Sequence, residues 1–321
     1  MLEIKKYITE QLDLWEKIVK NANNGTLFHT RKFLSYHPPG RFIDHSLIIY
    51  KKDKPYILFP AAEREINGKR FLVSHPGTSY GSFVVPAELP FADSYKIVES
   101  LIKYAKSHKF NGIRLTPPPT IYNRRLSNYI DFALLQHGFT YHKREISSIL
   151  FLENKVEQNL EKFKASHQRA VRKAIKEGVE IRESDQLEEF YQILKNNLKI
   201  RHNVTPTHTL DELLKLKELF PNEIKLFGAF LNNKMVAGVV NFTCTKDVVL
   251  AFYISHDEKY QETRALNLLF YSIFDWAIKN ELKVFDFGIF TVNEDPNFGL
   301  ARFKENFGAS GMFRDTFEII L

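Results

Sequence analysis

Three strand-like segments joined by very short turns lie between residues 223 and 255, and they constrain the fold more than any other feature. The segments Glu223–Leu231, Lys234–Thr245 and Val248–Ser255 are rich in β-branched and aromatic residues, as strands are. Asn232-Asn233 joins the first two, and asparagine tolerates the backbone angles of a tight hairpin turn. The pattern predicts an antiparallel meander.

The order of elements around this meander occurs twice along the chain. Helical periodicity precedes it at about 160–177, 185–204 and from 209, and a helix (262–280), a strand (283–290), a helix (298–307) and a strand (312–320) follow. The first half shows helices over 3–22 and 29–37, strands over 46–51, 56–65 and 70–75, then a helix over 91–108, a strand over 112–116, a helix ending at 137 and a strand over 141–152.

A length of 321 residues is typical of about two domains. We therefore expect an α/β (α+β) protein with domains 1–153 and 154–321, each a mixed, mostly antiparallel sheet flanked by helices. The last strand, at about 312–321, is a candidate to cross over and complete the first domain.

Composition limits the class of protein. Hydrophobic residues make up 44% of the chain and aromatic residues 14%, which is enough for packed cores and argues against disorder. The net charge of +7 favours anionic partners, and nucleotides, tRNA, the phosphates of CoA and anionic lipid all remain open.

Cysteine usage and the N-terminal residues bear on location. Cys244 is the single cysteine, so a disulfide framework is excluded and we expect it to pack in a strand. No Cys/His spacing resembles a zinc site, and we expect no metal. The first residues lack the apolar core of a signal peptide, and no apolar stretch is long enough to span a membrane. We expect a soluble, cytoplasmic protein, and the sequence does not reveal its oligomeric state.

The segment Phe285–Gly308 combines a buried strand that ends near Asp286 and Gly288 with a short helix that carries Arg302 and Lys304. Two cations near a strand end and a polar loop suit an anionic group such as a phosphate. A solvated amphipathic helix would show the same residues, so both interpretations stay open.

Four segments of the second half carry a resemblance to a known family. They are the basic helix Ser166–Val179, the strand, loop and helix Ala251–Asn267, Trp276-Ala277 leading to Asp286-Phe287-Gly288, and Gly299–Gly308. In this order and spacing they resemble the FemABX-like peptidyltransferases, a family of double GNAT-like acyltransferases. The first half resembles the family's first domain more faintly, through Ser74–Gly81.

This resemblance implies tandem GNAT-like domains and acyl transfer to an amine. Fem-type members move an amino acid from aminoacyl-tRNA to a peptidoglycan precursor, and GNAT relatives move an acyl group from acyl-CoA. By resemblance, Lys304 meets a phosphate of the donor or stabilises developing charge. We expect an acyl- or aminoacyltransferase that acts on an amine of a cell-envelope precursor and holds no tightly bound cofactor.

Two alternatives stay open. One is an acyl-CoA-dependent N-acyltransferase on a small molecule or a sugar. The other is a non-catalytic module that binds RNA or a nucleotide sugar. The turn His256–Ala265 bears on the first of these, because CoA-binding GNAT proteins normally have a glycine-rich turn there and this one contains no glycine. That departure argues against ordinary acetyl-CoA use without excluding CoA.

Several side chains are candidates for contact with the substrates. In the basic helix, Arg172 and Lys173 recur with other cations at spacings of three and four, which suits phosphate contact or a solvated face. The phosphate would belong to tRNA or to a nucleotide-linked acceptor, and Arg264, in the turn, is a third candidate for binding a substrate. We expect His75 and Tyr80, in the small polar loop 74–82, to contact substrate if that loop is a site and not merely a long turn.

The candidate catalytic residues lie after the basic helix. Arg201, His202 and His208 could bind or deprotonate the acceptor, although His208 or Thr209 could instead cap the next helix. Tyr253 could protonate the leaving group or simply pack. Asp286 could orient the amine or cap a turn.

Overall fold

A computed structural model describes residues 2–202 and 205–321, without the side chains of residues 200–202. The chain forms two compact units, Met1–Glu145 with Phe313–Leu321, and Ile146–Met312. Strand β8 (Thr140–Phe151) begins in the first unit and ends in the second, and β16 (Ser310–Ile320) runs from the second back into the first. Within these described residues, no helix has the length and apolar character needed to cross a membrane.

The first unit contains two sheets and four α-helices. Strands β1 (Leu2–Lys6), β3 (Leu47–Lys51) and β4 (Lys54–Phe59) form one sheet. The other has the order β2 (Ile43–Asp44), β5 (Ala62–Ile66), β6 (Lys69–Ser74), β7 (Gly112–Leu115) and β16. The helices are α1 (Leu12–Asn21), α2 (Arg31–Leu34), α3 (Phe91–Ser107) and α4 (Tyr129–Gln136).

A single large core holds the first unit together. Side chains of β3, β4, β6 and β7 pack with the inner faces of α3 and α4, and Phe317 of β16 joins them. Phe317 pairs with Leu115 in an antiparallel register between β16 and β7. A smaller cluster around Trp15 and Val19 lies under α1.

The second unit has one mixed sheet between two helical layers. Its strand order is β8, β13 (Val284–Ile289), β12 (Val248–His256), β11 (Lys234–Thr243), β10 (Ile224–Leu231) and β9 (Glu180–Ser184). Its helices are α5 (Val156–Lys162), α6 (Ala165–Lys176), α7 (Leu187–His202), α8 (Leu210–Leu219), α9 (Ala265–Lys279) and α10 (Phe298–Glu305). A two-stranded ribbon, β14 (Thr291–Val292) and β15 (Asp295–Pro296), lies between β13 and α10.

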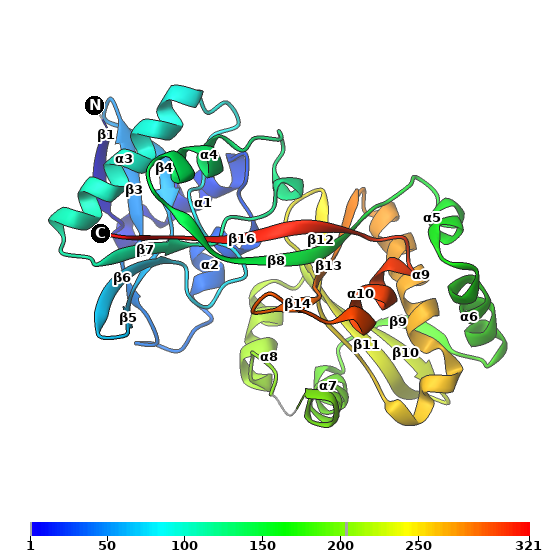
Figure 1. The fold of residues 1–321 in the computed structure, drawn as a ribbon. Coiled ribbons are helices and arrows are strands. Elements are labelled where there is room, and N and C mark those ends of the chain that lie inside the picture. Colours follow the sequence, from blue (N-terminus) through cyan, green and yellow to red (C-terminus); the bar gives the residue numbers. More distant parts are fainter. Residues whose placement is uncertain (1, 203–204) are drawn as a thin grey trace. The chain divides into compact units, whose positions relative to one another are not determined.

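The two faces of this sheet are covered by different helices, as Figure 1 shows. Helix α9 lies along one face with α6, over a core rich in phenylalanine that includes Phe270 and Phe285. Helices α7 and α8 pack on the other face. A Cβ atom on Gly238 of β11 would lie 2.4 Å from the Phe190 ring of α7, so the absence of a side chain there lets the helix approach the sheet closely.

The predicted meander is present in the second half, and the Asn232-Asn233 turn is confirmed, with φ angles of 50° and 62°. The meander expected in the first half is wrong, because β3 pairs with β4 in one sheet and β5 pairs with β6 in another. Three other predictions are wrong. Residues 2–6 form a strand against β3, not the start of a helix. The segment 56–65 is interrupted after Phe59 and forms two strands. The basic helix breaks between Lys162 and Ala165 into α5 and α6.

Candidate active site

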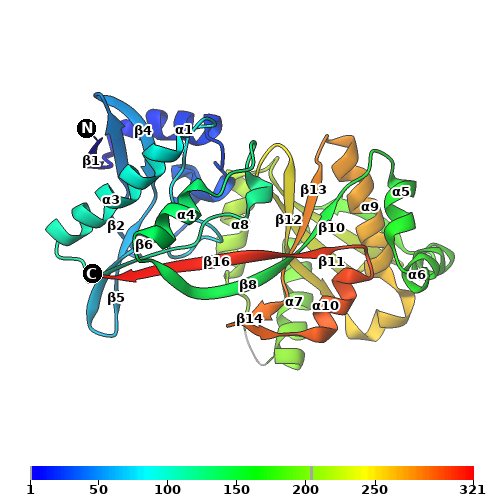
Figure 2. The ribbon, with the colours of Figure 1, turned by 45° about the horizontal axis from the view of Figure 1, so that its top comes forward.

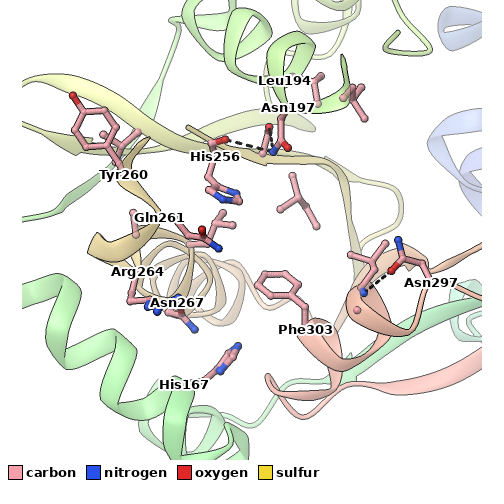
Figure 3. Close-up of a pocket in the computed structure, with 18 residues that line it drawn as sticks. His167, Leu194, Asn197, His256, Tyr260, Gln261, Arg264, Asn267, Asn297 and Phe303 are labelled. Carbon is pink, nitrogen blue, oxygen red and sulfur yellow. Dashed lines mark hydrogen bonds between the residues drawn. The ribbon is translucent and has the colours of Figure 1, made fainter. Parts of the chain in front are cut away.

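A pocket of about 500 Å³ lies within the second unit, at the end of β12. Figure 3 shows side chains from α6, α7, the end of β12, the turn that follows and α10 around this one space. The polar residues that line it are His167, Asn197, Ser255, His256, Tyr260, Gln261, Arg264, Asn267 and Asn297. Its apolar lining comes from Leu194, Leu198, Val236, Ile254, Ala265, Leu266, Gly299, Leu300 and Phe303.

The pocket exists because two neighbouring strands separate. Strands β12 and β13 are parallel, and their register covers Val248–Leu250 against Val284–Asp286. Beyond this, β12 continues to His256 on its pairing with β11, without a further partner on the β13 side in the described register. Backbone groups on that edge of β12 are therefore available to a ligand, as unpaired strand edges are.

The turn after β12 presents the N-terminus of α9 to the pocket. Residues Glu258–Thr263 form a short 3₁₀ helix, and Arg264 follows with φ of 59° before α9 begins at Ala265. The first amides of a helix have no acceptor within the helix, so they and the helix dipole favour an anion. The turn lacks glycine as the sequence shows, and Arg264 adopts the left-handed conformation that glycine usually supplies.

Three pocket residues each have a buried polar atom that finds no hydrogen-bond partner among the described residues. These atoms are Nε2 of His167, Oδ1 of Asn197 and Nδ2 of Asn267. The amide of Asn197 is held in place, because its Nδ2 donates to Ser255 Oγ at 3.1 Å. A buried polar atom without a partner costs free energy, so a ligand or water that supplied one would bind favourably.

His167 enters the pocket from the start of α6. Burial lowers its pKa, and the positive charge of Arg264 lowers that pKa further, so the imidazole is neutral near pH 7. Its ring packs edge-on against Phe307 at 4.8 Å between centroids. The resemblance included His167 among the residues of the basic helix, but no sequence pattern singled it out as part of a site.

Lys304 lies beneath the pocket and does not line it. Its side chain is 2% exposed, and Nζ donates to the carbonyls of Gly288 at 2.7 Å and Ile289 at 2.8 Å. Burial lowers the pKa of Lys304 to about 7, while Asp286 opposes that shift. In this arrangement the amino group ties α10 to the end of β13. The predicted contact with a donor phosphate stays a prediction.

Asp286 is fully buried in β13, and Oδ1 accepts a hydrogen bond from the amide of Gly288 at 2.7 Å. Gly288 has φ of 72°, so the carboxylate stabilises a turn that favours glycine. The interpretation of Asp286 as a residue that caps a turn is confirmed. Arg302, on α10, is exposed and does not line the pocket.

Tyr253 and His208 come together as a buried pair. The Tyr253 hydroxyl lies 2.8 Å from Nδ1 of His208 and accepts a hydrogen bond from the His208 backbone amide at 3.1 Å. Burial raises the pKa of Tyr253 to about 12, so the phenol keeps its proton. Thr209, not His208, caps α8, because its hydroxyl accepts from the Glu212 amide at 3.2 Å.

The cations of α6 form an exposed face beside the pocket. Arg169, Arg172, Lys173 and Lys176 are all exposed, and the opposite face of α6 buries Val171 and Ala174. Lys173 lies 3.8 Å from Glu262 in the turn after β12, which places this face next to Arg264. Lys173 and Arg264 both lie within 4 Å of Glu262, so these two predicted substrate-binding cations are neighbours. Their predicted role in substrate binding stays a prediction.

The candidates in the first unit are buried. Tyr80 is 1% exposed and packs between the rings of Phe28 and Tyr122, with the Arg314 guanidinium 4.8 Å from its ring. His75 is 7% exposed, and burial lowers its pKa to about 4. Both side chains are thus buried in the first unit, and their expected contact with substrate stays a prediction. The side chains of Arg201 and His202 lie outside the described residues.

Comparisons with known proteins agree with this geometry. Residues 161–305 match the family described as acetyltransferase (GNAT) domain. The fold is similar to that of FemX, with a TM-score of 0.75 at 14% identity over 99% of this chain and 97% of that one. It is also similar to L-PGS from Bacillus licheniformis, with a TM-score of 0.59 at 12% identity over 98% and 91% of the two chains. The sequence matches none of the curated proteins with which it was compared.

A tandem GNAT protein from the clavulanic acid biosynthesis pathway has a TM-score of 0.58 at 9% identity, over 100% of this chain and 98% of that one. These likenesses define the protein as one with a FemX-like tandem GNAT fold. The resemblance inferred from the sequence is confirmed at the level of the fold. The matched domain, residues 161–305, contains the whole pocket lining.

Proposed function

We propose that the second unit transfers an acyl or aminoacyl group from an activated, phosphate-bearing donor to an amine. One observation carries this proposal: the pocket combines a separated pair of parallel strands with the N-terminus of α9 and an adjacent cationic face. The free amides and Arg264 suit phosphate, and the space beside β12 suits the reacting end of the donor.

The chemistry requires little from the protein, because the donor is already activated. The amine nitrogen forms a bond to the carbonyl carbon, and the bond from that carbon to the leaving oxygen or sulfur breaks. The amine loses a proton, and the leaving group gains one. Positioning of the two substrates and stabilisation of the oxyanion lower the barrier most.

Groups for each of these tasks line the pocket. Backbone amides on the open edge of β12 can donate to the oxyanion. His167, neutral near pH 7, and His256 are the two imidazoles that line the pocket and can accept a proton. Tyr253 holds its proton and meets His208, so in this arrangement it supports the wall of the site and does not reach the leaving group directly.

The cationic face of α6 favours a large polyanion as the donor. Four exposed cations lie along α6, which is the kind of continuous positive face that suits the backbone of a polyanion. We therefore propose aminoacyl-tRNA as the donor and an amine on a cell-envelope precursor as the acceptor. Acyl-CoA remains the alternative donor, because the N-terminus of α9 would also suit a pyrophosphate.

The test measures thermal unfolding with each donor and then transfer of a labelled acyl group. A donor at a hundred times its dissociation constant should raise the melting temperature by about 5–10 °C. We expect this shift with aminoacyl-tRNA, and we expect the label to move to a UDP-linked muropeptide. A shift with acyl-CoA alone would instead support the N-acyltransferase.

A matched pair of variants on α10 links the result to the pocket. Leu300→Trp fills the space that Leu300 lines and should abolish the shift, whereas Phe298→Trp alters a side chain that is 74% exposed and outside the lining. If both variants keep donor binding, the pocket is not the donor site. Binding without any labelled product would favour the non-catalytic module.

A further inference from the structure

An apolar surface on the first unit does not belong to the proposed site. Helices α3 and α4 lie side by side, as Figures 1 and 2 both show. Six side chains from them and from the preceding loop form what we call the α3–α4 surface: Phe91, Tyr95, Leu126, Tyr129, Phe132 and Leu135. All but Tyr95 are more than a third exposed, and Leu126 reaches 77%. A contiguous apolar surface of this kind usually marks an interaction site.

Helix α4 is unusual because it is apolar on both sides. Ala133 and Leu134 are buried in the core of the first unit and Ile130 packs against it, while Tyr129 and Phe132 point outward with 45% and 47% exposure. A helix at the surface of a soluble domain normally has a polar outer face. The outer face of α4 therefore exposes apolar side chains to water. Contact with an apolar phase would remove this unfavourable exposure.

The exposed side chains are held in a fixed arrangement. The Phe91 ring lies 5.2 Å from Tyr129 and 5.9 Å from Phe132 between centroids. The backbone just before Leu126 is also held in place, because Asn23 accepts a hydrogen bond from the Arg125 amide and donates one to the Arg125 carbonyl, both at 2.8 Å. The surface is preorganised, so little conformational entropy is lost on binding.

Cations border this surface. Arg124 and Arg125 precede Leu126, and the Arg124 guanidinium contacts the carbonyl of Lys20 at the end of α1. On α3, Lys96, Lys103 and Lys106 are exposed. The acidic groups are fewer, three carboxylates against five cations: Glu88 lies 3.7 Å from Arg125, Glu99 pairs with Lys103, and Asp131 lies on α4. The border is therefore positive overall.

We propose that the α3–α4 surface binds the surface of an anionic lipid bilayer. Aromatic and leucine side chains that enter the interface, bordered by arginine and lysine at the level of the headgroups, are the combination that such a surface recognises. This inference does not depend on the proposed transfer reaction, because it uses residues of the first unit alone.

Size and charge favour lipid over a second copy of the chain. Six side chains of about 200 Å² each, about half exposed, offer on the order of 500 Å², whereas a stable dimer buries about 800 Å² on each partner. A symmetric pair of copies would also bring two positive borders together, which costs free energy. An anionic bilayer has the opposite charge, and binding to it does not require a minimum buried area of the kind that a stable dimer needs.

The test is sedimentation of the full chain with vesicles of phosphatidylcholine alone and with about one third phosphatidylglycerol. We expect binding to the anionic vesicles, weakened by high salt because screening shortens the reach of the cations. Leu126→Ser with Phe132→Ser should reduce the partition coefficient at least tenfold. Arg124→Gln with Arg125→Gln should reduce it by about 25-fold, since each cation near the surface contributes about fivefold.

A control pair, Val292→Ser with Phe298→Ser, removes two apolar side chains from the second unit that are 66% and 74% exposed, and it should leave binding unchanged. Circular dichroism establishes that each variant is folded. Failure of the wild-type chain to bind anionic vesicles would overturn the proposal, as would equal losses in the control pair. A dimer in light scattering that Leu126→Ser with Phe132→Ser dissociates, without vesicle binding, would assign the surface to a second copy.

Discussion

The Tyr253 hydroxyl meets both the backbone amide and Nδ1 of His208, at 3.1 Å and 2.8 Å. This pair joins the start of α8 to β12, the strand that forms one wall of the pocket. The Tyr191 hydroxyl also donates to the His208 carbonyl at 3.0 Å, so the connection before α8 is attached to the unit at several points. The position of this wall depends on a phenol that keeps its proton.

Replacing that phenol should destabilise the second unit. In Tyr253→Phe the buried amide of His208 loses its acceptor, which costs about 1–3 kcal/mol. Urea unfolding measures the loss, and a double-mutant cycle with His208→Leu should give less than the sum of the single changes, because both remove the contact between the hydroxyl and Nδ1. Unchanged stability together with a large fall in turnover would instead place Tyr253 in the chemistry.

Lys304 should make stability rise with pH. Its pKa is about 7 in the folded chain and about 10.4 when unfolded, so between these values the unfolded state binds more protons. The folded state is therefore penalised below pH 7 and gains stability, on the order of 4 kcal/mol, as pH rises from 7 to 10.4.

Denaturant unfolding at several pH values measures the slope of the unfolding free energy against pH, and Lys304→Met should flatten this slope. Lys279→Met, which removes an exposed lysine from α9, should leave the slope as it is. A wild-type slope that Lys304→Met does not change would mean that the buried amino group stays charged throughout this range.

Two substitutions at Arg264 separate the effect of its backbone conformation from the effect of its charge. The left-handed conformation costs about 1 kcal/mol or more for a residue with Cβ, so Arg264→Gly should be about that much more stable than Arg264→Ala. Both lose the guanidinium and should weaken donor binding equally, as measured by the donor-induced rise in melting temperature. Donor binding that Arg264→Gly alone retains would show that backbone amides, not the side chain, contact the donor.

The cationic face of α6 should set the salt dependence of donor binding. Arg169→Gln, Arg172→Gln and Lys176→Gln together remove up to three phosphate contacts, which should reduce the slope of log affinity against log salt by about 2–3. The matched triple Lys246→Gln, Lys279→Gln and Lys283→Gln removes the same charge elsewhere in the second unit and should alter the slope little. Equal effects of both triples would indicate non-specific attraction.

The sequence predicted the elements that local patterns determine. Asn232-Asn233 specifies its own turn, and the strands on either side alternate clearly, so β10 and β11 match the expectation closely. The sequence favours a helix over residues 2–6 because Ile4 and Ile8 fit helical spacing as well as they fit a strand. Pairing with β3, more than 40 residues away, decides the outcome, and no local pattern records it.

The difference between local patterns and long-range packing also explains which site residues could be predicted from the sequence. The charged groups of α6 and Arg264 stood out, because exposed cations at regular spacing are visible in a sequence. Asn197 lies in no motif, and Ser255 and Asn267 belong to the segment Ala251–Asn267 without a pattern that singles them out. They matter because tertiary packing buries one polar atom of Asn197 and one of Asn267 at the pocket. The charge of Lys304 is visible in the sequence, whereas its burial against the carbonyls of Gly288 and Ile289 depends on tertiary packing.

The pairing of β16 with β7 also means that the sheet of the first unit is completed only at the end of synthesis. Residues 313–321 complete the sheet of the first unit, yet the ribosome makes residues 146–312 before them. At bacterial or eukaryotic speeds this interval lasts on the order of ten to thirty seconds. During it, the edge of β7 that receives Phe317 stays open in the nascent chain, where chaperones or a neighbouring polypeptide can reach it.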